Sequence, residues 1–229
     1  MSDETDRRTA IRRGYDDLAD AYAAEREPSE GEVAAFQVLR DRLAAASSGS
    51  PTVVDAGCGA GTPVLEAFDG SPVEAVGIDF SSAQLARANE RGSVLQGDVT
   101  ALPIRSATAD AVTAFHSTIH VPTEQHEALY REFARVLRAE GWLLASVGEE
   151  GWTGSNPDWL DAGAAMHWSF PPLETTKEYL RDAGFSVVET WRSEDSIGDG
   201  SWAFLLCRLT DPEKGSTDAS DAEGEAGSL

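Results

Sequence analysis

The sequence predicts an α/β fold built on a doubly wound, seven-stranded sheet that is mostly parallel and has an antiparallel last strand. From residue 52 to 184, short apolar runs alternate with helical patterns of about ten residues, which is typical of parallel strands joined by covering helices. Two strand-like runs, 185–191 and 202–209, follow each other without a helix, so they predict an antiparallel pair at the sheet edge. A chain of 229 residues is long enough for one substantial core.

Two helices are predicted before the first strand, over residues 9–47, after a polar and flexible segment at residues 1–8. Ser29 followed by Glu32 is a capping-box pattern, which predicts that the second helix begins there and runs to about residue 46. The first helix is predicted because its apolar residues recur every three or four positions, as Ile11, Tyr15, Leu18 and Tyr22 do.

The other elements of the predicted sheet follow in chain order. The predicted strands are 52–56, 73–79, 93–96, 110–115, 142–147, 185–191 and 202–209. The predicted helices begin at Pro63, at Ser81 or Ser82 with an end near Arg91, at Thr123 with an end at Arg138, and at Thr175 with an end at Ala183. The helix from Thr123 turns its apolar side chains inward, which places His126 on its solvent-exposed part.

Two segments depart from this rhythm. Residues 148–172 combine glycines and prolines with a high density of aromatic side chains, so we expect a loop-rich insertion that contacts a substrate. Residues 211–229 carry six acids and one lysine and no large apolar residue before Leu229, which predicts a disordered, solvated tail. We therefore expect a single domain over residues 9–210.

The composition limits the possible partners. The chain has 18 basic and 40 acidic residues, a net charge of −22, and only two lysines, as in proteins of salt-accumulating archaea. Such a surface repels nucleic acid at low salt. Without a long apolar run or a signal-like N-terminus, we expect a cytoplasmic protein that does not bind membranes. Cys58 and Cys207 form no paired motif, and the histidines lack metal-ligand spacing, so we expect no metal site.

Three motifs follow the first three predicted strands. The run Gly57-Cys58-Gly59-Ala60-Gly61 lets the chain turn tightly and bring backbone N–H groups against a ligand, with Asp55 two residues upstream. At the next strand tip Asp79 can accept both hydroxyls of a ribose, with Phe80 beside it to face a purine. At the third, Asp98 can accept the exocyclic amine of adenine.

These motifs, in this order, resemble the class I S-adenosylmethionine-dependent methyltransferases over about residues 10–209. The resemblance implies a Rossmann-like fold in which the N-terminal helices form a lid. It also implies S-adenosylmethionine as cofactor, with Asp55 and the glycines at the methionine moiety, Asp79 at the ribose and Asp98 at the adenine. The residues it places at the cofactor are Tyr15, Tyr22, Asp55, Gly57, Cys58, Gly59, Asp79, Phe80, Gly97, Asp98, Val99, Phe115 and His116.

The expected acceptor is a small molecule, which attacks the methyl group in line. His120 is a candidate base and the aromatic insertion supplies candidate acceptor contacts, each weighed against plain core packing; these contacts are Trp159, Met166, His167 and Trp168. A non-catalytic cofactor-binding or regulatory module stays open as an alternative. A nicotinamide-dependent oxidoreductase is a further alternative, although Thr62 stands where that fingerprint has its third glycine. The oligomeric state is not predicted.

Overall fold

A seven-stranded sheet forms the centre of the computed structural model, which describes residues 2–46, 49–161, 163–194 and 200–213. The strand order is β3-β2-β1-β4-β5-β9-β8, and β9 is antiparallel to both of its neighbours while the other pairs are parallel. The strands are β1 (Thr52–Ala56), β2 (Glu74–Asp79), β3 (Ser93–Gln96), β4 (Ala109–Ala114), β5 (Leu137–Gly148), β8 (Phe185–Glu194) and β9 (Ser201–Leu209). The predicted fold class and edge pair are confirmed.

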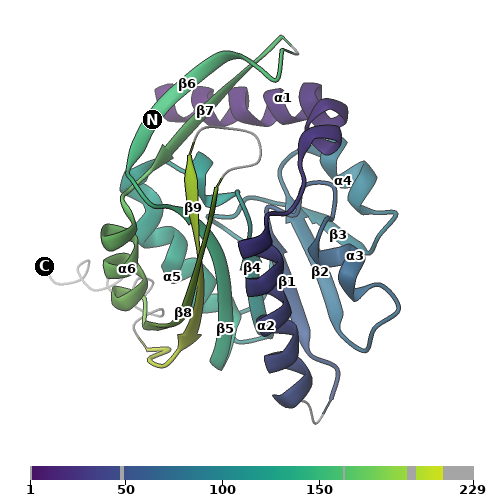
Figure 1. Cartoon of the computed structure of the whole chain (residues 1–229), viewed down its shortest axis with the longest axis vertical. Helices are drawn as coiled ribbons and strands as arrows, with labels where there is room; N and C mark the ends of the chain where they lie inside the picture. Colours follow the sequence, from purple (N-terminus) through teal and green to yellow (C-terminus); the bar gives the residue numbers. More distant parts are fainter. Residues whose placement is uncertain (1, 47–48, 162, 195–199, 214–229) are drawn as a thin grey trace, which may run out of the picture.

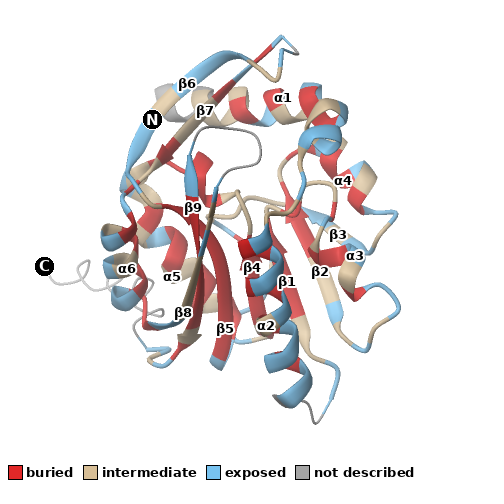
Figure 2. Cartoon of the chain, in the orientation of Figure 1, coloured by how far each residue is buried: buried red, intermediate tan, exposed pale blue. Residues whose placement is uncertain are grey.

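Helices cover both faces of this sheet (Figure 2). The side chains of successive strand residues alternate between the two faces. On one face α5 (His126–Val136) and α6 (Leu173–Asp182) pack over Val54 and its neighbours. On the other, α2 (Glu30–Ala46) and α3 (Val64–Phe68) pack over Val53. The helix α4 (Ser82–Ala88) lies against β2 and β3 and ends earlier than predicted.

The helix α1 (Ser2–Glu25) crosses above the carboxyl ends of the strands (Figure 1). It begins at Ser2, so the prediction that residues 1–8 precede the helix is wrong from Ser2 onward. Arg8, within the first turns of this helix, pairs with Asp98 after β3. The local sequence pattern gives no sign of this distant partner. Farther along, Asp16 accepts hydrogen bonds from the Ser81 hydroxyl at 2.7 Å and the Ala83 N–H at 3.1 Å. These contacts fix α1 over α4.

The segment 148–172 forms a β-hairpin, so the prediction of a loop-rich insertion is wrong. The hairpin consists of β6 (Trp152–Trp159) and β7 (Ala164–Phe170), which pair antiparallel and apart from the main sheet. The alternation of side chains along its strands was not visible in the sequence, because aromatic residues occupy both faces. In the structure, Ala164 and Met166 point to the same face and pack against Ile11 and Leu18 of α1. The hairpin and α1 therefore form one cover (Figure 1).

His126 is also placed differently from the prediction. It is buried at the start of α5, where its Nε2 lies 3.0 Å from the Val121 carbonyl oxygen and its ring contacts Tyr130. The preceding 3₁₀ turn η2 (Thr123–Gln125) winds the chain more tightly than the predicted α-helix and turns this side chain inward.

Among the described residues, none of the helices combines the length and the apolar character needed to cross a membrane. The predicted acidic tail, 211–229, lies outside the described residues from 214 onward.

Candidate functional site

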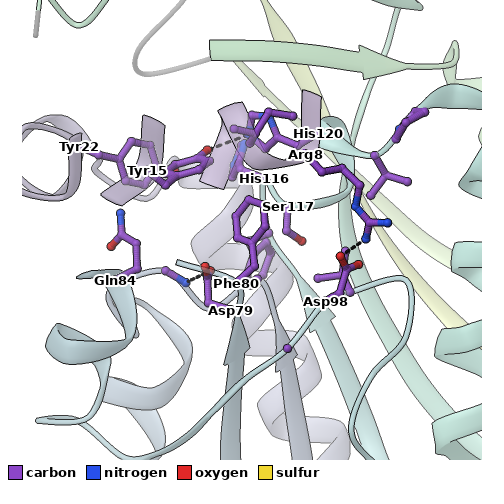
Figure 3. Close-up of a pocket in the computed structure, with 18 residues that line it drawn as sticks. Arg8, Tyr15, Tyr22, Asp79, Phe80, Gln84, Asp98, His116, Ser117 and His120 are labelled. Carbon is purple, nitrogen blue, oxygen red and sulfur yellow. Dashed lines mark hydrogen bonds and ion pairs between the residues drawn. The ribbon is translucent and has the colours of Figure 1, made fainter. Parts of the chain in front are cut away.

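The site lies between α1 and the carboxyl ends of β1, β2 and β4 (Figure 3). Three adjoining cavities occupy this space. A small cavity of about 80 Å³ lies over β2, and a second of about 360 Å³ continues it over the glycine-rich turn. A third, of about 930 Å³, lies under the hairpin. Tyr22 borders all three cavities, and Tyr15 and His116 border both the first and the third.

The glycine-rich turn after β1 requires its glycines. Gly57 has a φ of +81° and Gly59 a φ of +51°, in the left-handed region. A Cβ atom on Gly57 would lie 2.1 Å from the Cβ of Ser117, so a side chain there forces the two segments apart. The Cys58 side chain points away into a cluster with Leu65 and Leu85, which leaves only its backbone for a ligand.

Asp79 ends β2 with its carboxylate buried under the first cavity. One oxygen accepts the Gly59 N–H at 2.9 Å and the other accepts the Ser81 N–H at 2.8 Å. Burial raises the pKa of Asp79 to about 6, while these two hydrogen bonds oppose the rise. Because a carboxylate oxygen can accept two hydrogen bonds, each oxygen keeps one acceptor position for a ligand.

Asp55 lies one strand away and borders the second cavity. Its carboxylate accepts the Thr113 hydroxyl at 2.7 Å and is 3% exposed. The pKa of Asp55 is raised to about 7, chiefly by burial; the Thr113 hydrogen bond opposes the rise, and the negative charges of Asp79 and Glu32 add to it. A bound cation beside it would relieve this cost, which suits a ligand with an ammonium group.

Asp98 already has partners. One of its oxygens accepts the Thr100 N–H at 2.8 Å and the Thr100 hydroxyl at 2.6 Å, and the other pairs with Arg8 of α1. Its neighbours Gly97 and Val99, together with Phe80, line the first cavity. Arg8, which lines the same cavity, thus pairs with the carboxylate that a ligand amine would approach (Figure 3).

His120, in the 3₁₀ turn η1 (Thr118–His120), has both ring nitrogens engaged. Its Nδ1 lies 2.7 Å from the His167 carbonyl oxygen, so it carries the proton, and its Nε2 accepts the Tyr15 hydroxyl at 2.7 Å. Burial lowers the pKa of His120 to about 4 and raises that of Tyr15 above its usual value. The structure therefore holds a neutral imidazole that orients Tyr15.

The third cavity includes two of the four predicted acceptor contacts. Trp159 and Trp168 line it. Met166 is fully buried, because its side chain points from the hairpin toward α1 and packs there. The prediction that it contacts an acceptor is therefore wrong. His167 serves through its backbone carbonyl, which accepts from His120, and its side chain does not border the described cavities.

Several lining residues were missed by sequence reasoning. Gln84 is 1% exposed, and neither its amide nitrogen nor its oxygen has a hydrogen-bond partner among the described residues. Its side chain rises from α4 toward Tyr22 (Figure 3). Arg26 and Glu32 border the second cavity as a buried ion pair, with Glu32 Oε2 3.5 Å from His116 Nε2. The only available signal for Glu32 was its capping-box position, and there its backbone N–H does donate to the Ser29 hydroxyl oxygen at 3.3 Å.

Phe115 and His116 follow β4 where the cavities meet. His116 has a φ of +51°, a strained backbone conformation for a residue with a side chain, and its N–H donates to the Ser146 hydroxyl at 2.6 Å. Its ring lies edge-on to Trp202, with the centroids 5.1 Å apart. Among the described residues, no group of three or more metal-ligating side chains is arranged to hold an ion.

A profile of the family described as "Methyltransferase domain" matches residues 53–141, which include the glycine-rich turn and all three acidic strand tips. Over these residues the chain is a methyltransferase domain of the class I, S-adenosylmethionine-dependent kind. This match sets aside the nicotinamide-dependent oxidoreductase as an alternative.

Relatives of this chain include the 27-O-demethylrifamycin SV methyltransferase of Amycolatopsis mediterranei, which is 34% identical over 46% of this chain and 42% of its own length. The sterol 24-C-methyltransferase of Candida albicans is 32% identical over 67% of this chain and 45% of its own length. The chain thus spans less than half the length of these curated relatives.

A solved structure confirms the methyltransferase fold. The 1,6-didemethyltoxoflavin-N1-methyltransferase of Burkholderia thailandensis superposes with a TM-score of 0.69, covering 91% of each chain at 19% identity.

Proposed function

We propose that this protein binds S-adenosylmethionine and transfers its methyl group to a small-molecule acceptor. The observation that carries the proposal is that the cavity over Asp79 meets a separate, larger cavity at Tyr15, Tyr22 and His116. Two cavities with a shared aromatic boundary suit a reaction that brings a cofactor and an acceptor together end to end.

The described residues fit this cofactor. The two open acceptor positions on Asp79 match the two neighbouring hydroxyls of a ribose. Asp55 faces the second cavity, where it would hold the ammonium group, and the turn through Gly57 and Gly59 admits the methionine moiety without a side-chain clash. Gln84 adds an unpaired buried amide beside the ribose position, a polar group that needs a ligand partner.

The adenine would lie beside Phe80, with its amine on Asp98 and a ring nitrogen on the Val99 N–H. This position requires Arg8 to leave Asp98, and the partly exposed pair between them is easily exchanged. Tyr15, Tyr22 and Phe115 border the methionine end. Aromatic faces there attract a positively charged sulfur by about 0.5–2 kcal/mol.

When bound, the cofactor would supply a sulfonium methyl group: the new bond from the acceptor to carbon would form as the carbon–sulfur bond breaks with its electrons on sulfur, and a proton on the acceptor atom would pass to solvent. The protein's part is to align the two molecules and exclude water. Because a pKa of about 4 makes a charged His120 costly, we assign it a positioning role: it holds the Tyr15 hydroxyl at the boundary of the two cavities. This role replaces the base predicted from the sequence.

We further propose that residues 9–210, together with the first turns of α1 that carry Arg8, act as one domain, in the cytoplasm of a cell with high internal salt. The support is the net charge of −22, which favours hydration in concentrated salt. Assays therefore belong in molar KCl.

Titration calorimetry with S-adenosylhomocysteine in molar KCl tests the cofactor assignment. We expect saturable binding of one molecule per chain. If no saturable binding occurs, the proposed function is wrong. A non-catalytic binding module would bind the cofactor in the same way, so transfer of a labelled methyl group must be measured separately.

A further inference from the structure

We propose that the acceptor is a planar, multi-ring aromatic molecule that stacks in the cavity under the hairpin β6–β7. This inference rests on the proposed function and adds the class of acceptor. It is drawn from the shape and the chemistry of the cavity walls.

Aromatic side chains from four parts of the chain form the walls. The cavity is lined by Tyr15, Tyr22, Trp152, Trp159, Trp168, Phe170 and Trp202. The rings touch one another along the hairpin: Trp168 has its centroid 5.3 Å from that of Trp159 and 5.7 Å from that of Trp152. They therefore form one extended aromatic surface.

Trp152 is the most informative of these rings. It is 48% exposed, although its contacts with Trp168 and Phe170 place it on the cavity wall. A large apolar ring left half open to water gains hydrophobic free energy when a ligand covers it. Clustered exposed aromatic surface of this kind marks a binding site.

The size of the cavity argues against a small cationic acceptor. An aromatic cage for an ammonium group needs ring faces within about 6 Å of one point, which a compact space satisfies. The cavity under the hairpin has about 930 Å³, near the upper end of the range of about 300–1,000 Å³ for small-molecule sites.

Among the described residues of the segment 148–172 that line this cavity, the polar ones lie at its open rim. Glu150, Ser155 and Asn156 line it and are exposed to solvent. A flat acceptor can thus bury its faces against the rings and keep polar substituents at the rim. Offset and edge-to-face contacts between aromatic rings add about 0.5–1.5 kcal/mol per pair beyond the burial of area, which a saturated ring of the same size lacks.

The test compares two bicyclic alcohols of similar size by calorimetry, with the protein saturated with S-adenosylhomocysteine. We expect planar 2-naphthol to bind saturably and at least tenfold more tightly than its saturated counterpart, 2-decalol. Trp152→Leu should weaken 2-naphthol binding three- to tenfold, because it removes one stacking wall and adds no burial cost at a half-exposed position. Trp168→Leu provides a second variant of the same surface.

Trp191→Leu is the matched control, because Trp191 is partly buried in the core and does not line the cavity. It should leave 2-naphthol binding within twofold of the wild type. If 2-decalol binds as well as 2-naphthol, or if neither binds while S-adenosylhomocysteine does, the planar acceptor is refuted and the proposed function stands. If S-adenosylhomocysteine itself fails to bind, the proposed function fails instead.

Discussion

Replacing Asp79 with alanine tests the assignment of the ribose position. Each carboxylate oxygen spends one acceptor position on a backbone N–H, of Gly59 or Ser81, and keeps one for a ligand hydroxyl. A hydrogen bond to a charged group contributes about 1.5–3 kcal/mol, so losing one lowers affinity at least tenfold and losing both lowers it on the order of a hundredfold or more. We expect a loss in this range for S-adenosylhomocysteine.

The assay is titration calorimetry in molar KCl at pH 8, where Asp79 is ionised because its pKa is about 6. Glu74→Ala is the matched control, since Glu74 lies exposed at the opposite end of the same strand and its loss changes the net charge equally. Circular dichroism and thermal unfolding of the apoprotein check that the variant folds. If the affinity of a folded Asp79→Ala protein stays within threefold of the wild type, the reasoning is refuted.

Three further predictions concern stability and the turn. The pKa of Asp55 is raised to about 7 from its ordinary value near 4, so its contribution to stability is present at low pH and lost as the pH rises to 7. Between pH 5 and pH 8, the free energy of unfolding of Asp55→Asn in urea should therefore rise by about 2 kcal/mol relative to that of the wild type. Parallel curves of unfolding free energy against pH for the two proteins would contradict this. Asp16→Ala should destabilise the protein by about 1–2 kcal/mol and speed proteolysis within α1, because it removes a partly buried carboxylate that accepts hydrogen bonds from Ser81 and Ala83. The control Asp17→Ala, at an exposed position, should do neither. Gly57→Ala should abolish cofactor binding in calorimetry, while Gly70→Ala, which has a similar positive φ but open space around it, should bind normally; equal loss in both variants would contradict the steric argument.

The local pattern was enough to predict the sheet. The apolar run Thr52–Ala56 and the run Ser93–Gln96 coincide with β1 and β3, because short strands with turn residues on both sides leave little freedom in where they begin and end. The acidic strand tips followed from this, since the carboxyl ends of neighbouring parallel strands share one edge. Asp55 and Asp79 accordingly lie at the same site.

Features set by distant partners could not be predicted. The first turns of α1 contact the strand ends through the pair of Arg8 with Asp98, and the hairpin packs against α1 through Met166. Neither contact leaves a mark in the local sequence. His120 looked like a free base because the sequence does not show that Tyr15 and the His167 carbonyl occupy its two nitrogens.

The central claim, methyl transfer to a small molecule, is tested most directly with S-adenosylmethionine labelled on its methyl group. The wild-type protein in molar KCl is incubated with a small-molecule extract, and the Asp79→Ala variant serves as the blank. The account predicts that the label appears in a low-molecular-weight product with the wild type and is at least tenfold lower with the variant. If the wild type binds S-adenosylhomocysteine yet transfers no label above the blank, the protein is a binding module and the claim of catalysis is contradicted.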